Sequence, residues 1–227
     1  MADRYFQETL TDGVVRLDPE TSHHLARVLR ARPGDELRLF DGRGGEARAV
    51  LEDVDPRHAS ARVLSLERRP PLPARRLTLA FSPPKAGRVE VVLRMAVELG
   101  ACVLQPVHAR RTPPEGRGTG RRWPRILAAA AGQCGATWLP ELHPALDLAA
   151  WIAGPLAAFD GERWVATPGP EPGSAVRPVA DLPPAVVVVG PEGDFEPAEH
   201  EALRGAGCRP LPLGPHVLRV ETACAAA

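Results

Sequence analysis

The chain has 227 residues, of which 44% are hydrophobic and 25% are charged, and its 28 Lys and Arg residues are balanced by 28 Asp and Glu residues. This composition is ordinary for a soluble globular protein of one large or two small domains, and it excludes a collagen-like or largely disordered chain. No apolar run is long enough to span a membrane, so we expect a cytoplasmic protein without a membrane partner. Four widely spaced cysteines without a C-x-x-C pair argue against a disulfide framework and a metal site.

The first 70 residues are predicted to form a compact β-rich domain. Short apolar segments indicate strands at residues 14–17, 37–40, 47–51 and 61–66. A helix is expected after the first of these, capped by Thr21 or Ser22. The sequence Asp41-Gly42-Arg43-Gly44-Gly45 is a strong signal for a β-hairpin. Several short strands with one helix suggest a small barrel, a fold that often binds nucleic acid on an exposed face.

A linker is predicted at residues 68–73, where paired prolines stiffen the chain. The second domain, residues 74–227, begins with strand–helix–strand order, which predicts a parallel α/β sheet. Gly100 is expected to end the helix of this unit. A further strand is expected at residues 157–159, ending at the ligand site.

Positive charge is concentrated in residues 74–126, where eleven Lys and Arg residues and three Asp and Glu residues give a formal charge of +8. Such a concentration is typical of contact with a phosphate backbone, although a solvated basic loop is the alternative. A loop rich in Pro, Gly and Arg follows the strand that ends near residue 107. We expect four arginines of this region to bind RNA phosphates: Arg110, Arg111, Arg121 and Arg122.

Two apolar strands near the C-terminus each end in a Gly-Pro turn. Residues 186–189 are four consecutive valines, as in a strand buried on both faces of a parallel sheet, and Gly190-Pro191 follows them. A helix is expected from Pro197, with Glu196 and Glu199 as a partial capping box. The second strand ends at Gly214-Pro215. Open α/β sheets bind small ligands at the carboxyl ends of their strands, but ordinary strand–helix connections are the alternative.

This pair of turns resembles the signature of a bacterial family, the small-subunit (16S) ribosomal RNA uridine N3-methyltransferases, which have the knotted SPOUT fold. The resemblance is carried by Gly190-Pro191-Glu192-Gly193, by Leu213-Gly214 and by Leu218-Arg219-x-Glu221-Thr222. His23-His24-Leu25 and Phe40-Asp41-Gly42 are similar to the N-terminal domain of that family. The resemblance implies a C-terminal SPOUT-type α/β trefoil knot with a parallel sheet at residues 74–227, and an N-terminal PUA-like β-barrel that binds RNA at residues 1–70.

The resemblance also implies that S-adenosylmethionine is the methyl donor. No G-x-G-x-x-G is present, so a Rossmann-type donor site is not supported. The glycine-containing turns let backbone groups approach a ligand closely. The residues implied to bind the donor are Val189, Gly190, Pro191, Glu192, Gly193, Leu213, Gly214, Leu218, Arg219 and Thr222.

Methylation of uracil at nitrogen 3 requires that nitrogen to lose a proton, which leaves negative charge on the two carbonyl oxygens. Arg219 is the candidate for stabilising this charge, and Glu221 could orient Arg219 through a charge-assisted hydrogen bond. A structural salt bridge between them is the alternative. Arg4 and Arg30 are expected to bind RNA, against the alternative of ordinary surface arginines.

The family resemblance implies a homodimer with the donor site near the subunit interface, acting on small-subunit ribosomal RNA or the assembled 30S subunit. Two departures stand out: Asp194 replaces a usual glycine, and Gly132 and Ala136 stand where an acid and an arginine are usual. These departures leave two alternative functions open. One is a methyltransferase that acts on a tRNA or on a ribose 2′-hydroxyl, and the other is a non-catalytic RNA-binding protein.

Overall fold

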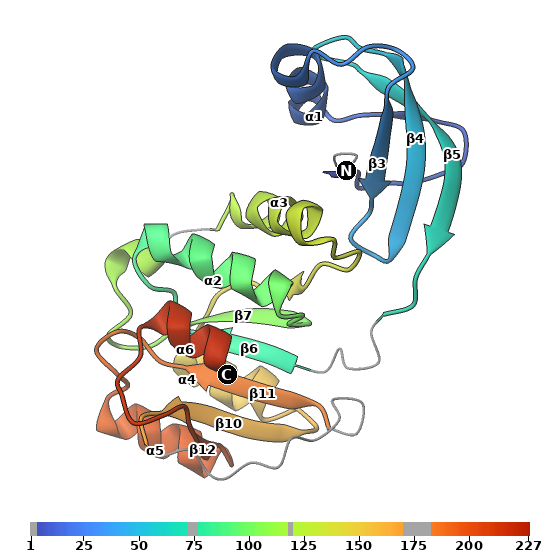
Figure 1. Cartoon of the computed structure of the whole chain (residues 1–227). Coiled ribbons are helices and arrows are strands. Elements are labelled where there is room, and N and C mark those ends of the chain that lie inside the picture. Colours follow the sequence, from blue (N-terminus) through green and yellow to red (C-terminus); the bar gives the residue numbers. More distant parts are fainter. Residues whose placement is uncertain (1–3, 72–76, 118–119, 170–182) are drawn as a thin grey trace. The chain divides into compact units, whose positions relative to one another are not determined.

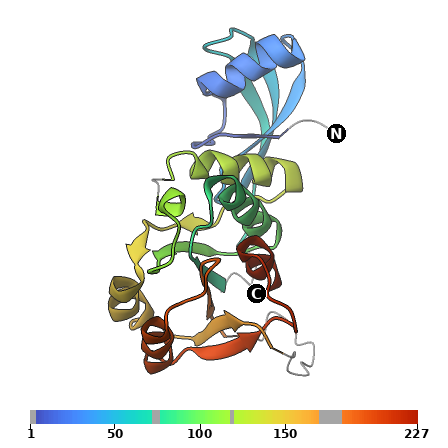
Figure 2. The ribbon, with the colours of Figure 1, turned by 90° about the vertical axis from the view of Figure 1, so that its left-hand side faces the viewer.

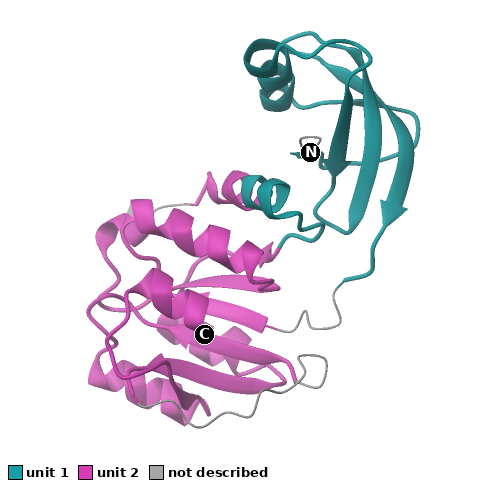
Figure 3. Ribbon diagram, in the orientation of Figure 1, with its two compact units in different colours: residues 1–71, 128–139 teal, residues 72–127, 140–227 magenta. Residues whose placement is uncertain are grey.

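The computed structural model describes residues 4–71, 77–117, 120–169 and 183–227 (Figure 1). The chain divides into two compact units (Figure 3): unit 1 is residues 1–71 and 128–139, and unit 2 is residues 72–127 and 140–227. The expected linker extends to residues that lie outside the described part, and the division into domains 1–70 and 74–227 stays a prediction. In the described part no helix is long and apolar enough to cross a membrane.

Unit 1 is built on a curled five-stranded sheet in the order β1-β3-β4-β5-β2. β1 pairs with β3 in parallel, and the other pairs are antiparallel. Leu37 and Leu39 alternate with polar residues and are buried, so one face of the sheet covers the core. The strands are β1 (Arg4–Phe6), β2 (Val14–Arg16), β3 (Glu36–Phe40), β4 (Gly45–Asp53) and β5 (Ser60–Arg68).

The helix of unit 1 begins earlier than the sequence suggested. α1 (Pro19–His23) continues into the π-helical segment η1 (His24–Leu29). Its cap is Asp18, whose carboxylate accepts hydrogen bonds from the backbone N–H groups of Glu20 and Thr21. The expected cap at Thr21 or Ser22 is therefore wrong, because Asp18 before Pro19 supplies the acceptor and proline starts the helix.

The predicted hairpin between β3 and β4 is confirmed. The Asp41 carboxylate accepts hydrogen bonds of 2.8 Å from the backbone N–H groups of Arg43 and Gly45. It also forms an ion pair of 3.1 Å with Arg68. One buried aspartate thus accepts hydrogen bonds from two backbone N–H groups of the turn.

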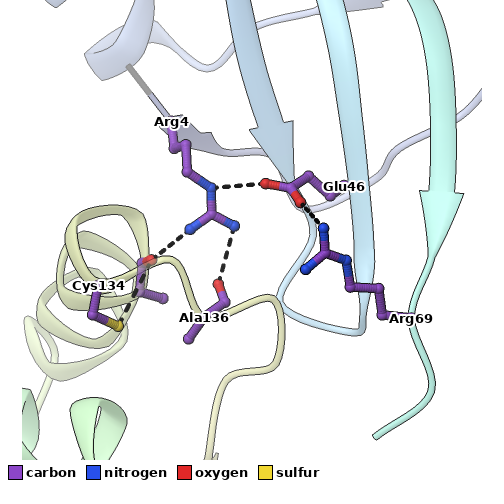
Figure 4. Close-up of polar contacts among 6 residues, drawn as sticks. Arg4, Glu46, Arg69, Cys134 and Ala136 are labelled. Carbon is purple, nitrogen blue, oxygen red and sulfur yellow. Dashed lines mark hydrogen bonds and ion pairs between the residues drawn. The ribbon is translucent and has the colours of Figure 1, made fainter. Parts of the chain in front are cut away.

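Arg4 joins three segments of unit 1 (Figure 4). Its Nε donates to Glu46 at 3.0 Å, its Nη1 to the carbonyl of Ala131 at 2.9 Å and its Nη2 to that of Ala136 at 3.3 Å. The guanidinium lies over the Phe40 ring, and the Arg4 side chain is 11% exposed. These bonds attach the carboxyl end of α3 (Trp123–Cys134) to the sheet of unit 1.

Unit 2 contains a parallel sheet in the order β12-β10-β11-β6-β7-β8, with β9 paired to β7. The strands are β6 (Leu77–Phe81), β7 (Val103–His108), β8 (Glu141–Leu142), β9 (Leu146–Asp147), β10 (Glu162–Thr167), β11 (Ala185–Val189) and β12 (Arg209–Pro212). The predicted α/β fold and the valine strand are confirmed. The strand expected at residues 157–159 is wrong: Ala157 caps a π-helical segment, and β10 begins at Glu162.

Helices cover both faces of this sheet (Figure 2). α2 (Ala86–Glu98) and α6 (Val220–Ala226) pack together, and α4 (Leu148–Trp151) packs with α5 (Pro197–Gly205). Two further segments are the 3₁₀ turn η2 (Pro114–Arg117) and the π-helical η3 (Ile152–Leu156). Gly100 follows α2 with a φ of 81°, as the predicted helix end requires.

The last segment of the chain returns from the edge of the sheet to its middle. β12 is an edge strand, yet α6 packs against α2 and β11 (Figure 1). The chain therefore crosses the carboxyl ends of β10 and β11 after leaving β12. The expected α/β class is confirmed: unit 2 has a parallel sheet, and unit 1 has a curled sheet as expected for a PUA-like domain.

We predict that Arg4→Ala lowers the free energy of unfolding by about 2–4 kcal/mol, because two carbonyls lose a donor and the mostly buried Glu46 carboxylate keeps only Arg69 as a partner. Urea denaturation measures the change. Arg48→Ala is the matched control, because Arg48 pairs with Glu36 at the surface and its side chain is 61% exposed; its loss should be below about 1 kcal/mol. Equal losses in the two variants would contradict a structural role for Arg4.

Candidate functional site

A pocket of about 180 Å³ lies at the carboxyl ends of β10 and β11, under the returning C-terminal segment. Three pieces of chain form its walls: the end of β10, the turn after β11, and the segment from Leu213 into α6. The lining residues are Ala166, Thr167, Pro168, Val189, Gly190, Pro191, Glu192, Asp194, Leu213, His216, Val217, Leu218, Val220 and Ala223.

The turn after β11 is held by close packing beneath it. The backbone N–H of Asp194 donates to the carbonyl of Pro191 at 2.9 Å, which closes the turn. Phe195 is buried, and a Cβ added to Gly190 would lie 2.9 Å from its ring. Only glycine fits at position 190 without movement of this ring.

The second wall is tied to the end of β10. The N–H of Leu213 donates to the carbonyl of Thr167 at 3.0 Å, and the N–H of Gly169 donates to that of Gly214 at 2.9 Å. Gly214 has a φ of 120°, a conformation that favours glycine. These bonds make Ala166–Pro168 part of the pocket. The sequence pattern did not indicate this wall, because the strand expected at residues 157–159 begins five residues before β10.

Six of the ten residues predicted to bind the donor line the pocket: Val189, Gly190, Pro191, Glu192, Leu213 and Leu218. The other four adjoin it. Gly193 lies in the first turn and Gly214 in the second, while Arg219 and Thr222 are exposed at the start of α6. The roles of all ten residues remain predictions. The position of six of them around one pocket supports these predictions.

Arg88 on α2, which the sequence analysis did not single out, connects two carboxylates beside the pocket. Its Nη1 lies 3.1 Å from Glu192 Oε1, and its Nε lies 3.9 Å from Glu221 Oε1. The Glu221 side chain is 14% exposed, and its Oε2 is buried without a hydrogen-bond partner in the described part of the chain. Arg219, the predicted partner of Glu221, is exposed and forms no ion pair with any described residue.

The titratable side chains among the described lining residues are Glu192, Asp194 and His216, and no lysine or arginine is among them. Asp194 Oδ1 accepts from the N–H of Phe195 at 2.7 Å and lies 3.2 Å from His200 Nε2. Beside the pocket, burial raises the pKa of Cys224, and the negative charge of Glu221 raises it further. The Cys224 thiol therefore stays neutral.

The pocket fits the donor implied by the resemblance. Its walls combine aliphatic side chains with backbone turns, which suit the flat apolar face and polar edge of an adenine ring. Its carboxylates complement a positively charged group. Within the described residues no cluster of His, Cys, Asp and Glu could hold a metal ion.

The arginines predicted to bind RNA differ in their surroundings. Arg30, Arg110, Arg121 and Arg122 are exposed. Arg111 is partly engaged, since its Nη1 donates to the carbonyl of Gly193 at 2.7 Å and its Nε lies 3.9 Å from Glu196. Arg4 is occupied by the contacts within unit 1 described above, which give it a structural role.

Comparison with known proteins gives two family matches. A model described as an RNA methyltransferase domain matches residues 70–227, and one described as an RNA methyltransferase PUA domain matches residues 17–64. The chain is 34% identical to the ribosomal RNA small subunit methyltransferase E of Synechocystis, over 95% of this chain and 72% of the relative. It is 32% identical to that of Mycobacterium bovis, over 98% of this chain and 88% of the relative.

A solved structure is similar over the whole chain. The ribosomal RNA small subunit methyltransferase E of Neisseria gonorrhoeae, bound to S-adenosyl methionine, superimposes with a TM-score of 0.84 and 28% identity. The match covers 100% of this chain and 94% of the other.

We predict that Gly190→Ala lowers the free energy of unfolding by about 1–3 kcal/mol, because the new methyl group forces the buried Phe195 ring to move. Gly87→Ala on α2 is the matched control. Its Cβ meets nothing within 4 Å, so it should stabilise the protein by about 0.5–1 kcal/mol through helix propensity. Thermal or urea unfolding of both variants measures the two changes in the free energy of unfolding. A neutral Gly190→Ala would mean that the turn is not tightly packed.

Proposed function

Because the chain belongs to the RNA methyltransferase family that includes the ribosomal RNA small subunit methyltransferases E, we propose that it methylates nitrogen 3 of a uridine in 16S ribosomal RNA. It is an RNA methyltransferase that uses S-adenosylmethionine as methyl donor. The observation that carries the proposal is the pocket at the ends of β10 and β11, framed by the turn at Gly190 and the segment from Leu213 to Leu218.

We propose that the methyl donor occupies this pocket. The Neisseria relative is described as bound to S-adenosyl methionine, and the open volume here argues against a donor site filled by side chains. When bound, the donor supplies a methyl group already activated by its positively charged sulfur. The chain has to hold it in line with the acceptor nitrogen and exclude water. Val189–Glu192 and Leu213–Leu218 are the segments proposed to do so.

The target uridine has to leave the base stack, because its pairing edge is otherwise covered. As nitrogen 3 loses its proton and bonds the methyl carbon, negative charge on the two carbonyl oxygens needs a positive partner. We propose Arg219 for this role, because its exposed guanidinium is unpaired among the described residues. Glu221, proposed to orient Arg219, would do so from the first turn of α6 while its carboxylate also faces Arg88.

The exposed arginines of unit 2 are proposed to bind the RNA backbone. Arg110, Arg121 and Arg122 have no side-chain ion pair among the described residues, so phosphates can approach them. Arg30 is proposed as a contact of the N-terminal domain, which matches a PUA domain model. Arg4 is left out of this set, because the contacts within unit 1 occupy its guanidinium.

The partner RNA is proposed to be small-subunit ribosomal RNA, free or in the assembled 30S subunit. The names of the relatives support this substrate. A ribosomal substrate implies that the protein works in the cytoplasm. We also propose that it acts as a homodimer with the donor site near the subunit interface.

We predict that the purified protein methylates 16S RNA or 30S subunits from cells that lack it, at a single uridine. Reverse transcription would stop at that nucleotide, because a methyl group at nitrogen 3 blocks pairing. Arg219→Ala should lower turnover by roughly 100-fold or more, a larger factor than the change in the dissociation constant of S-adenosylmethionine, measured by calorimetry. A methyl group on a ribose or on a tRNA would contradict the proposed substrate, and near-normal turnover would remove Arg219 from the mechanism.

We predict that changing Arg110, Arg121 and Arg122 together to Ala weakens RNA binding and flattens its salt dependence. Each lost phosphate contact should reduce the slope of log K against log salt by about 0.7–0.9. Titrations at several salt concentrations measure the slope. The control is the triple change of Arg48, Arg57 and Arg204, which are exposed arginines outside the predicted set. Equal slopes in the two triple variants would contradict the assignment.

A further inference from the structure

We propose that Asp194 makes the pocket prefer the positively charged methyl donor over the neutral product that remains after transfer. This inference rests on the proposed function, because it concerns the same pocket. Asp194 would then determine specificity, although it is not among the ten residues predicted to bind the donor.

Asp194 is a pocket-lining residue in a left-handed backbone conformation, which aspartate tolerates better than most non-glycine residues. Its φ is 61°, in the left-handed region that glycine adopts at little cost and other residues rarely adopt. In the described part of the chain, Arg30 is the other non-glycine residue with a positive φ. A glycine would also fit this backbone conformation, so Asp194 adds a carboxylate whose side chain is 69% exposed.

The charge of Asp194 is not neutralised by a guanidinium. Its Oδ1 accepts from the N–H of Phe195 and faces His200, which compensates the charge only if it is protonated. By contrast, Glu192 is paired with Arg88. Arg88 also pairs with Glu221, so these two carboxylates and one guanidinium together carry a net charge of −1.

The other charged groups around the turn do not cancel the net negative charge of these carboxylates. Arg111 reaches the carbonyl of Gly193 and is matched by Glu196 at 3.9 Å. His216 is the remaining titratable group among the described lining residues. The pocket wall is therefore acidic and suits a cation.

S-adenosylmethionine and S-adenosylhomocysteine differ by one methyl group and one positive charge on sulfur. Both keep the same adenosine, amino and carboxylate groups. We expect the negative charge of Asp194 to attract the positively charged donor and to lose that attraction once the methyl group has been transferred. The product therefore leaves the pocket more readily, and the donor replaces it.

The test measures the dissociation constants of both compounds by calorimetry, for the wild-type protein, Asp194→Asn and Asp194→Gly. Asn keeps the shape and tolerates a left-handed backbone, whereas Gly also removes the steric strain of the turn. Both remove the charge. The ratio of product to donor dissociation constants should fall by about threefold or more in both variants, the factor produced by one unit charge at roughly 6 Å in a water-like dielectric.

Glu201→Gln on α5 is the matched control, since it removes one exposed carboxylate outside the pocket lining. Its ratio should equal that of the wild-type protein. A ratio of dissociation constants in the Asp194 variants equal to that of the wild-type protein would overturn the proposal. If both constants then changed by the same factor, Asp194 would act only on the shape of the turn. If the wild-type protein bound neither compound, the proposed function itself would fail.

Discussion

The close approach of the Phe195 ring to the backbone of Gly190 is the constraint on which the pocket depends. β11 brings four buried valines to the middle of the parallel sheet, and the chain must turn sharply where they end. Phe195 packs into the core on one side of the sheet with Leu203 and Val188. The turn is thus anchored from below, and its upper side is left open for a ligand.

The ends of neighbouring parallel strands supply the other walls. β10 lies between β11 and β12, so hydrogen bonds from Leu213 and Gly169 bring the returning segment over its end. α6 then closes the pocket through Val220 and Ala223. The return of the chain over the carboxyl ends of β10 and β11 therefore brings three distant segments together around one small volume.

The parts of this fold that follow from local rules could be predicted from the sequence. The valine strand, the glycine turns and the Asp41 hairpin each have a signal within a few residues. β10 was misplaced because apolar residues at 157–159 precede an Asp-Gly pair, whereas Glu162–Thr167 mixes charged and apolar residues. The roles of Arg88 and Arg4 depend on contacts with residues 104 and 127 positions away, which no local pattern announces.

Cys224 places a neutral sulfur next to the pocket. It follows Ala223, which lines the pocket, and burial together with the charge of Glu221 keeps its sulfur protonated. A thiolate would be a strong nucleophile and an ideal target for an alkylating agent, whereas a thiol is a poor one. A buried, neutral thiol beside the pocket is therefore a poor acceptor for a methyl group.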